Sequence, residues 1–404
     1  MQLNKGMDLK LCLGNTCRHV ALSPWYRSGK EFLVRSVFFW VLTISATACG
    51  VAQPSSTKVV NSSETVGPEL QKELDLWIAD PKHRGVSASV IFADGSQWEG
   101  VDGLSADGEA LQSNHLISIA SITKTMTGAL ILQLASESAL SLDDPVSRWL
   151  PPRMNIDTNI TIRQLLNHTN GLANYTANPA FAAVVSESKV HIFSIEELLT
   201  FVGPPQFAPG EGVQYTNTAF ILLGEILERV TGKPIEELYH ERLWDPIGLK
   251  EIFLPVCEEP PGLVAFTLGN KGLVDPSDQI SWFSAMYSAF GLMASARNIA
   301  CWGHALFEDN VLTVEMQKEM RTVVPASGSI PGEQGVGLGI RSYHYLGRIQ
   351  YGHSGGSPFG SSLLLYDPQT RVIVAVLMNQ SSGADHFTLA PKLLDIASQD
   401  QASP

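Results

Sequence analysis

The sequence predicts an α+β fold, in which one antiparallel sheet is built from both ends of the chain and an all-helical lobe lies between them. Strand patterns occur at about 86–101 and again from 336 to 378, and tight turns separate the strands of each group. Consecutive strands joined by tight turns must be antiparallel. Between about 140 and 270 the pattern changes to helices that are separated by Pro and Gly.

The predicted boundaries follow from these patterns. The part of the catalytic domain that holds the sheet is expected at about 68–120 and 270–400, and the helical lobe at about 121–270. The chain has 404 residues, of which 44% are hydrophobic, which is ample for a core of this size. Its net charge of −13 argues against nucleic acid and against anionic membrane surfaces as partners.

The first 48 residues have the order of a secretion signal. Basic residues at 27, 30 and 35 precede the apolar run Val37 to Ala48, which ends in small residues. About a dozen apolar residues are too few to span a bilayer. We therefore expect an exported protein, periplasmic or secreted, with a signal segment at 1–48 and a linker rich in Ser, Thr and Val at 49–67. Cys49 directly follows the small residues and resembles the acylated cysteine of bacterial lipoproteins, so a lipid anchor is the alternative to free export.

The elements before the lobe are a helix and a hairpin. Pro68 opens a helical pattern that has Leu70, Leu74, Trp77 and Ile78 on one side. An alternating run then starts at residue 86, Asp94-Gly95 gives a turn, and a second strand follows at 98–101.

In the lobe and the C-terminal part, each element is bounded by turn or cap residues. The expected helices are Thr161–Leu166, Ile195–Phe201, Thr218–Thr231 and Ile235–Leu243. The expected strands are Val336–Tyr345, Arg348–Gly352, Ser361–Tyr366 and Val372–Met378, and the leucines at 389, 393 and 394 predict a closing helix packed on the sheet.

The first chemical motif is Ser121-Ile122-Thr123-Lys124, at the head of a run that is apolar on all sides and is therefore expected to be a buried helix. Residues three apart on a helix lie on one face, so the Ser121 hydroxyl and the Lys124 amine can meet. Burial and the helix dipole both disfavour an ammonium there. We predict that Lys124 is a base that takes the proton of Ser121, a covalent nucleophile. The same spacing at Ser55/Lys58 and Ser186/Lys189 lacks such a helix.

Two further motifs carry polar groups. Tyr215-Thr216-Asn217 runs into the third lobe helix, where a phenol can relay protons and a carboxamide can bond a lysine and a substrate amide; a turn tyrosine with an Asn cap is the structural alternative. Tyr351-Gly352-His353-Ser354-Gly355-Gly356 ends a strand, and its glycines let a substrate backbone approach. One N–H group there can join that of Ser121 in an oxyanion hole, with His353 as a donor or positive charge at the rim.

In this order, Ser-x-x-Lys, Tyr-x-Asn and His-x-Gly resemble the motifs of the serine β-lactamase and D,D-peptidase superfamily of penicillin-recognising enzymes. Stretches such as Leu140 to Val146 and Ile162 to Leu172 are also similar to family signatures. The resemblance covers about 70–400 and implies a β-lactamase-like fold. By position it makes Ser121, Lys124 and Tyr215 catalytic, and it assigns substrate and oxyanion contacts to Asn217, His353, Gly355 and Gly356.

The resemblance implies a D-alanyl-D-alanine carboxypeptidase-like or β-lactamase-related peptidase or amidase, acting on a cell-wall peptide, amide or ester. His353 replaces the usual lysine of the third motif, as in some D,D-carboxypeptidase-like members. A histidine is only partly charged near neutrality, which weakens the case for true β-lactamase activity. His168 and Asn170 belong to a turn that we interpret as structural.

Three alternatives remain open from the sequence. The machinery also suits an esterase of the same superfamily, and a penicillin-binding sensor would keep the fold without turnover. Gly352 to Gly356 also fits the nucleophile elbow of α/β-hydrolases, with Ser354 as the nucleophile, although Pro358 and Gly360 stand where its helix should begin.

No metal or organic cofactor is implied, since no metal-ligand spacing occurs. Cys257 and Cys301 are expected to be buried free thiols, although a bond between them is possible in an oxidising compartment. The sequence does not indicate an oligomeric state.

Overall fold

The computed structural model describes residues 8–13, 16–21, 62–269, 272–309, 311–326, 330–381 and 385–399. The apolar run of the predicted signal, Cys49 and most of the predicted linker lie outside these residues. Near the N-terminus, β1 (Asp8–Leu13) pairs with β2 (Thr16–Ala21) in an antiparallel hairpin. Among the described residues, no helix has the length and apolar character needed to cross a membrane.

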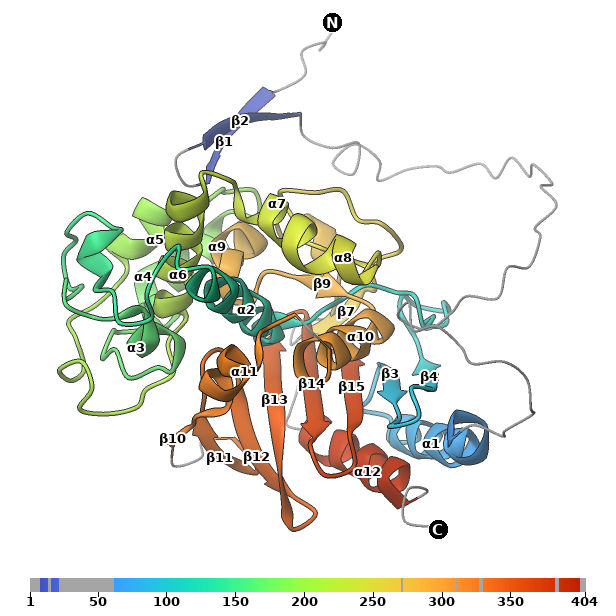
Figure 1. Ribbon diagram of the computed structural model, residues 1–404. Helices are drawn as coiled ribbons and strands as arrows, with labels where there is room; N and C mark the ends of the chain where they lie inside the picture. Colours follow the sequence, from blue (N-terminus) through green and yellow to red (C-terminus); the bar gives the residue numbers. More distant parts are fainter. Residues whose placement is uncertain are drawn as a thin grey trace, which may run out of the picture.

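One eight-stranded sheet forms the centre of the molecule, in the order β10-β11-β12-β13-β14-β15-β3-β4 (Figure 1). Every neighbouring pair is antiparallel, and β3 from the N-terminal part pairs with β15 from the C-terminal part. The predicted α+β fold is therefore confirmed. The strands are β3 (Gly85–Ile91), β4 (Gln97–Gly103), β10 (Val324–Pro325), β11 (Glu333–Val336), β12 (Arg341–Tyr345), β13 (Arg348–Ser357), β14 (Gly360–Asp367) and β15 (Val372–Met378).

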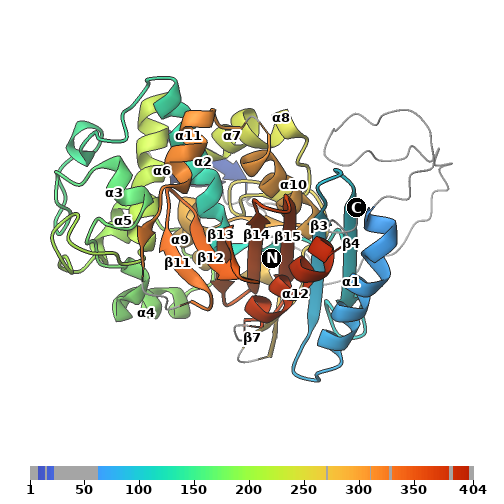
Figure 2. The same ribbon diagram turned by 60° about the horizontal axis from the view of Figure 1, so that its bottom comes forward.

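Two helices cover one face of this sheet. Both α1 (Ser62–Ile78) and α12 (His386–Gln399) pack on it, as Figure 2 shows from the side of these helices. Alternate strand residues face them and form a separate apolar layer with Leu74 and Leu393. The closing helix expected from the C-terminal leucines is thus present and packed as predicted.

The start of α1 corrects the predicted linker, because the helix begins at Ser62 and not at Pro68. Tertiary contacts hold these extra turns. The Ser62 N–H donates to Asp94 Oδ2 at 3.0 Å, and Val66 is buried in the layer that contains Trp98. The sequence pattern missed this segment because its contacts come from the β3–β4 turn and not from its own periodicity.

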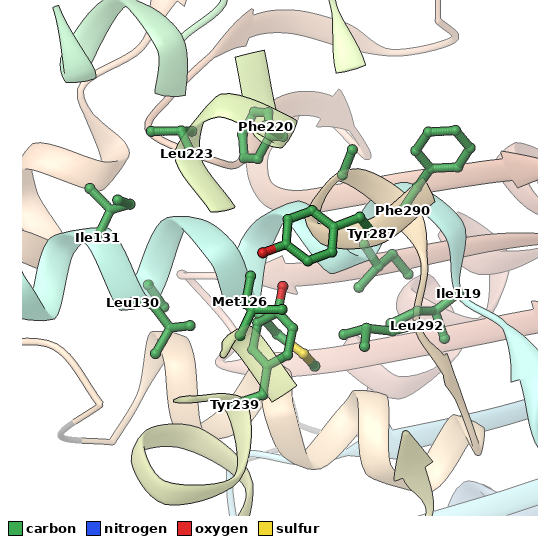
Figure 3. Packing of buried hydrophobic residues seen from close by; sticks show 14 of the residues in the cluster. Ile119, Met126, Leu130, Ile131, Phe220, Leu223, Tyr239, Tyr287, Phe290 and Leu292 are labelled. Atoms are coloured by element: carbon green, nitrogen blue, oxygen red, sulfur yellow. The ribbon is translucent and has the colours of Figure 1, made fainter. Parts of the chain in front are cut away.

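The other face of the sheet carries α10 and the helical lobe. In the lobe, α2 runs through the core, and Figure 3 shows Met126, Leu130 and Ile131 of this helix packed among side chains from α6 and α9. The helices on this side are α2 (Thr123–Ser136), α3 (Ile162–Leu166), α4 (Pro179–Glu187), α5 (Ile195–Thr200), α6 (Asn217–Thr231), α7 (Ile235–Tyr239), α8 (Asp245–Ile247), α9 (Ile280–Phe290), α10 (Ala296–Phe307) and α11 (Val314–Arg321).

Short strands connect the lobe to the sheet. β5 (Ile117–Ser118) and β6 (Ile252–Phe253) both pair with β9 (Met293–Ala294), and β7 (Thr267–Gly269) pairs with β8 (Gly272–Val274). The chain enters α2 directly after β5, through the 3₁₀ turn at 120–122.

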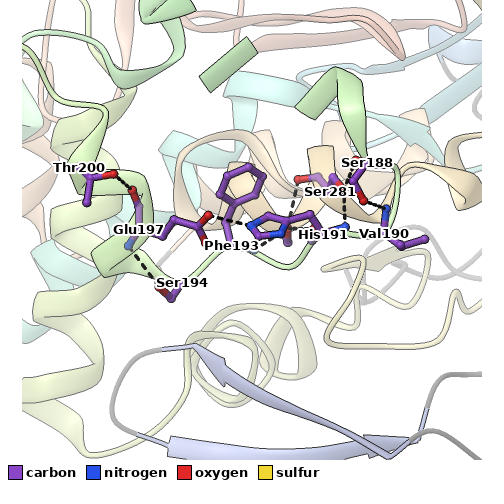
Figure 4. A network of polar contacts seen from close by, with 9 residues as sticks. Ser188, Val190, His191, Phe193, Ser194, Glu197, Thr200 and Ser281 are labelled. Carbon is purple, nitrogen blue, oxygen red and sulfur yellow. Dashed lines mark hydrogen bonds and ion pairs between the residues drawn. The ribbon is translucent and has the colours of Figure 1, made fainter. Parts of the chain in front are cut away.

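Helix α9 belongs to the lobe by its contacts, although it follows the predicted boundary at 270. It packs against α2 and α6. Its first turn is tied to the loop before α5 by a polar network (Figure 4): Ser281 Oγ donates to the Ser188 carbonyl at 2.5 Å and accepts from the His191 N–H at 2.6 Å. His191 also lies 2.8 Å from a carboxylate oxygen of Glu197 in α5. This network fixes α9 on the lobe.

The predicted strand Val336–Tyr345 is two strands. β11 ends at Val336 and β12 starts at Arg341, with a turn between them. Gly339 has a φ of 78° and packs against Gly128 of α2, where a side chain on either residue would crowd the other backbone. The turn exists because α2 passes there, which the local sequence does not reveal.

The two body cysteines, Cys257 and Cys301, do not form a disulfide with each other. Cys301 is disulfide-bonded, so the expectation of two free thiols was wrong for this residue. The alternative expected from the sequence was a Cys257–Cys301 bond, and that bond is absent.

A buried carboxyl in α6 gives the first testable prediction. Glu228 is 8% exposed, and burial raises its pKa from 4.5 to about 7. Since the raised pKa favours the protonated form in the folded state, stability is greatest below about 4.5 and falls as the pH rises to about 7. This difference corresponds to on the order of 3 kcal/mol. The free energy of unfolding of Glu228→Gln, compared with that of the native chain, should therefore be more favourable at about pH 8 than at about pH 5.

Thermal unfolding of both proteins at the two pH values checks this prediction. An equal offset in Tm at both values would contradict it. Glu241→Gln is the matched control, since the side chain of Glu241 is 50% exposed and should leave the offset independent of pH.

Candidate active site

Ser121 lies on the 3₁₀ turn that leads into α2 and is partly exposed. The residue before it, Ala120, has a φ of 45°, in the left-handed region that a residue with a side chain rarely adopts. Packing holds this strained backbone in place, since Ala120 is fully buried against the sheet. The turn leaves the Ser121 hydroxyl at the boundary between lobe and sheet.

The Lys124 amine lies in the interior, one helical turn after Ser121, and its side chain is completely buried. Its Nζ is 3.1 Å from Ser121 Oγ and donates to Asn217 Oδ1 at 2.8 Å and to the Ala289 carbonyl at 2.7 Å. Burial, with the positive charge of Arg341 nearby, lowers the pKa of Lys124 well below 10.5. Both effects favour the neutral amine form of Lys124.

The Tyr215 phenol contacts the same hydroxyl from the other side. Its O–H donates to Ser121 Oγ at 2.7 Å, and its ring lies 4.5 Å from the ring of His168. Burial raises the pKa of Tyr215 to about 12, although the Arg341 guanidinium acts in the opposite direction. Tyr215 is thus a protonated phenol near neutral pH.

Asn217 is the first residue of α6, directly after its cap Thr216, whose side chain accepts from the Thr218 N–H. This position turns the carboxamide toward α2, where its oxygen accepts from Lys124 and its Nδ2 lies 3.4 Å from Thr176 Oγ1. The Tyr-x-Asn motif therefore spans the site: Tyr215 contacts the serine and Asn217 contacts the lysine.

The third motif lies in β13, beside the Ser121 turn. β12 pairs with β13 only as far as Gly352, and residues 353–357 pair with β14. Position 355 requires a glycine because β13 and the Ile119 carbonyl lie close together: a Cβ at Gly355 would be 2.3 Å from that carbonyl oxygen. At Gly356 a Cβ would meet open space. The backbone of this segment is thus close to Ser121 and, at Gly356, accessible.

His353 differs from the expected donor or positive charge at the pocket rim. It is 2% exposed, and burial together with the charge of Arg341 holds its pKa well below 6.5. Its Nδ1 lies 2.6 Å from the Ser354 carbonyl oxygen, which can only accept, so Nδ1 carries the proton. His353 is a buried neutral imidazole, which the sequence could not show because the charges around it come from other elements.

Ser354 does not have the setting of an α/β-hydrolase nucleophile. It lies inside β13, pairs with Leu363 of β14, and is 7% exposed. A strand and not a helix follows it, so the strand-to-helix turn of that motif is missing. The structure leaves Ser121 as the serine with a base beside it in these motifs.

Sequence reasoning missed three contributors to the site. The Ala289 carbonyl in α9 accepts from Lys124, Arg341 of β12 lies 4.6 Å from the Tyr215 ring centre, and Glu333 of β11 pairs with Arg341. A backbone carbonyl has no sequence signal. Arg341 had a weak one, since it is a charged residue within the predicted strand Val336–Tyr345, whereas Glu333 stands before that strand in a stretch with Pro and Gly.

Within the described parts of the chain, no group of three or more His, Cys, Asp or Glu side chains is arranged to hold a metal ion. The residues brought together at Ser121 supply a hydroxyl, an amine, a phenol, a carboxamide and an imidazole, a set that supports nucleophilic chemistry with proton transfer.

Comparison with known proteins identifies the family of this chain. A family model described as Beta-lactamase matches residues 72–398. This chain belongs to the beta-lactamase family. Relatives in this family are serine hydrolases that include carboxypeptidases, aminopeptidases and esterases, and this member is likewise a serine hydrolase.

Among the curated relatives, the chain is 28% identical over 281 residues to the D-alanyl-D-alanine-carboxypeptidase/endopeptidase AmpH of Escherichia coli strain K12, covering 61% of this chain and 69% of that protein. It is 32% identical over 156 residues to the esterase EstB of Burkholderia gladioli, covering 36% of this chain and 40% of the esterase. A D-stereospecific amidohydrolase from Streptomyces is a solved structure that superposes with a TM-score of 0.71 at 28% identity, covering 80% of this chain and 96% of that one. By their names, these relatives of a beta-lactamase family member include a peptidase, an esterase and an amidohydrolase.

Proposed function

We propose that this protein is an acyl-enzyme hydrolase that cleaves short peptides and amides of D-amino acids, with Ser121 as the nucleophile. One observation carries the proposal: Ser121 Oγ lies within hydrogen-bond distance of both the Lys124 amine, at 3.1 Å, and the Tyr215 phenol, at 2.7 Å. A hydroxyl between a base and an acid is the arrangement that nucleophilic acyl transfer needs.

The hydrogen bonds of Lys124 support its role as the base. A neutral amine has two N–H groups and one lone pair. The two closest contacts of Nζ are Asn217 Oδ1 and the Ala289 carbonyl, which can only accept, so they take both N–H groups. The lone pair is then left for the third contact, the Ser121 hydroxyl. Lys124 thus receives the Ser121 proton when the oxygen attacks a carbonyl carbon.

Tyr215 completes the proton path. With a pKa of about 12 it is protonated before the reaction, so it can give its proton to the departing nitrogen when the tetrahedral intermediate collapses. The phenolate that forms takes back a proton from the Lys124 ammonium. The net transfer is from Ser121 to the leaving group, and the acylated Ser121 is then hydrolysed by water along the same path in reverse.

The remaining motif residues are proposed to hold the substrate. The N–H groups of Ser121 and Gly356 would bind the developing oxyanion, and Asn217 would contact the substrate amide. Gly355 allows β13 to approach the Ser121 turn. Because His353 is neutral, it offers no positive charge to a substrate carboxylate, which argues against β-lactams as the main substrate.

The substrate class rests on the relatives. AmpH is named as a D-alanyl-D-alanine carboxypeptidase and endopeptidase, and the Streptomyces structure as a D-stereospecific amidohydrolase. Both names describe amide cleavage at D-amino acids. An esterase is the second candidate, favoured by the 32% identity to EstB over 156 residues.

A substrate panel tests the proposal. Purified protein is incubated with D-alanyl-D-alanine peptides, D- and L-amino acid amides, a short-chain p-nitrophenyl ester and a fluorescent penicillin, and quenched samples are peptide-mapped for an adduct. We expect an adduct on Ser121 and faster turnover of D- than of L-amides. Turnover of the ester alone would replace the proposal with the esterase, and an adduct on another residue would overturn both.

Tyr215→Phe tests the acid role. It keeps the ring beside His168 but removes the proton donor, so the kcat/KM for an amide should fall about 100-fold. A p-nitrophenyl ester should lose much less, because its leaving group departs without a proton. Equal losses on amide and ester would contradict the assignment. Tyr345→Phe is the control, since this phenol donates to the Pro331 carbonyl away from the site.

We also propose that the protein is exported, on the strength of the basic and apolar segments before residue 48. N-terminal sequencing of the mature protein and a test for a lipid on Cys49 distinguish a free exported form from an anchored one. An intact N-terminus in the cytoplasmic fraction would overturn this proposal.

A further inference from the structure

A buried ion pair lies directly behind the proposed acid of the site. Arg341 is 4% exposed and Glu333 is 7% exposed, and their side chains form an ion pair. Removing two charges from water has a free-energy penalty that can exceed their attraction, so a buried ion pair is weak evidence for stability. Its presence here therefore needs another explanation. Its position beside Tyr215 supplies one.

A β-bulge brings the pair together. Val336 lies opposite Arg341 and Gly335 opposite Ser342, but Glu333, and not Gln334, lies opposite Tyr343. This irregularity turns Glu333 inward and leaves Gln334 exposed. Since Arg341 and Tyr343 are two residues apart on one strand, they share a face with Glu333. The extra residue in β11 therefore places Glu333 on the face of the sheet where it can pair with Arg341.

The pair holds the guanidinium at the Tyr215 ring. The Arg341 guanidinium carbon is 4.6 Å from the ring centre, and the guanidinium Nε is buried with no hydrogen-bond partner among the described residues. This cation thus has a donor left over beside a phenol whose oxygen contacts Ser121. The titratable groups around it are Lys124 of α2, His168 of the turn after α3, Tyr215, Glu333 of β11, Tyr343 of β12 and His353 of β13.

We propose that Arg341, fixed by Glu333, is a positioning residue that holds Tyr215 against Ser121 and stabilises the phenolate formed when Tyr215 protonates the leaving group. In that step the Tyr215 O–H bond breaks, the leaving nitrogen gains the proton, and the negative charge on the phenol oxygen is balanced by the guanidinium. The Lys124 ammonium then returns a proton to the phenolate. The inference rests on the proposed acyl-enzyme function.

The same charge acts on the resting site. Burial is the main cause of the lowered pKa of Lys124, and the charge of Arg341 adds to it, which favours the unprotonated base. Burial, with the charge of Arg341, also holds the pKa of His353 and of His168 well below 6.5, so neither adds a second positive charge beside Tyr215. A single permanent cation therefore acts on the amine and on both imidazoles in the same direction as burial.

A double-mutant cycle with Tyr215→Phe tests the inference. Arg341→Met/Glu333→Gln removes both charges without leaving either one unpaired. With an amide or anilide substrate we expect kcat/KM to fall roughly 100-fold, with a much smaller loss on a p-nitrophenyl ester. In the Tyr215→Phe background the amide effect should vanish. An effect of the same size in both backgrounds would overturn the inference.

The pH profile gives an independent readout. Removing the cation should raise the pKa of Lys124 and move the acid limb of kcat/KM to higher pH, whereas Arg341→Lys, which keeps the charge, should leave the limb near its native position. An unmoved limb in the double variant would count against the electrostatic role. If Arg341→Met/Glu333→Gln fails to fold, Glu333→Gln alone releases the guanidinium from its position and should still lower amide turnover more than ester turnover, by less than the double variant because the charge remains.

The matched control is the Arg153–Glu225 ion pair in the lobe, in which Glu225 is also buried and the two charged groups are 2.6 Å apart. Arg153→Met/Glu225→Gln should change stability without selectivity between amide and ester. Failure of the proposed function is recognised separately, because the native protein would then form no Ser121 adduct with any substrate of the panel.

Discussion

Replacement of Ser121 by alanine should reduce turnover to the uncatalysed background, a loss of about 10⁶-fold for a serine hydrolase nucleophile. Ser121 Oγ is the atom on which the contacts of Lys124 and Tyr215 converge, at 3.1 and 2.7 Å, and no other hydroxyl is placed to replace it in these motifs. Acylation by a fluorescent penicillin or a slow amide should be lost at the same time. Progress curves and gel fluorescence measure the two effects.

Ser354→Ala is the control for this variant. Ser354 lies in β13 near Ser121, but it is 7% exposed and pairs within the sheet. This variant should keep the label and most of its activity. Label lost in Ser354→Ala and kept in Ser121→Ala would reverse the assignment of the nucleophile. Circular dichroism and Tm verify that both variants are folded.

Lys124→Met should slow acylation by about 10³ to 10⁴-fold while Ser121 remains intact. Methionine fills similar space but has no lone pair that can accept the Ser121 proton. It also leaves the Ala289 carbonyl and Asn217 Oδ1 without their donor, so we expect a loss of about 1–3 kcal/mol in the free energy of unfolding. Single-turnover acylation and denaturant unfolding measure the two quantities.

The pH dependence separates a base from a structural lysine. Since Lys124 acts without its proton, the native rate should fall as the pH drops through its pKa, which burial holds well below 10.5. The residual activity of Lys124→Met should lack that limb. An acid limb that persists unchanged in the variant would mean that another group is the base.

A decoy in the same chain provides the control. Ser186 and Lys189 have the same spacing as Ser121 and Lys124, but both are exposed at the end of α4. Ser186→Ala and Lys189→Met should leave activity and its pH profile unchanged. Equal losses at the two sites would show that the spacing alone, and not the buried setting, was being measured.

Local geometry explains why one part of the site was predictable. Ser121 and Lys124 are three residues apart at the start of a helix, and this spacing alone puts them on one face. The sheet could be predicted for a similar reason, because tight turns dictate antiparallel neighbours. The additional turns of α1 and the break between β11 and β12 were missed, because contacts with Trp98 and Gly128 from other elements cause them.

The protonation state of each site residue could not be predicted from the sequence. His353 was expected to carry a partial positive charge, but it is neutral because it is buried near Arg341. Arg341 itself received no role, since nothing in the strand pattern of 336–345 shows that a bulge turns Glu333 inward to meet it. A pKa depends on burial and on charges from distant segments, and neither is a local property of the chain.

The sequence by itself determined the fold class and the order of the three motifs, because helix and strand periods and turn residues act over a few neighbours. Only the tertiary structure decided which hydroxyl meets both an amine and a phenol, how each is protonated, and that a buried Arg341–Glu333 pair stands behind Tyr215. These features depend on the exclusion of water and on contacts between residues far apart in the chain, which arise only when the lobe and the sheet pack together.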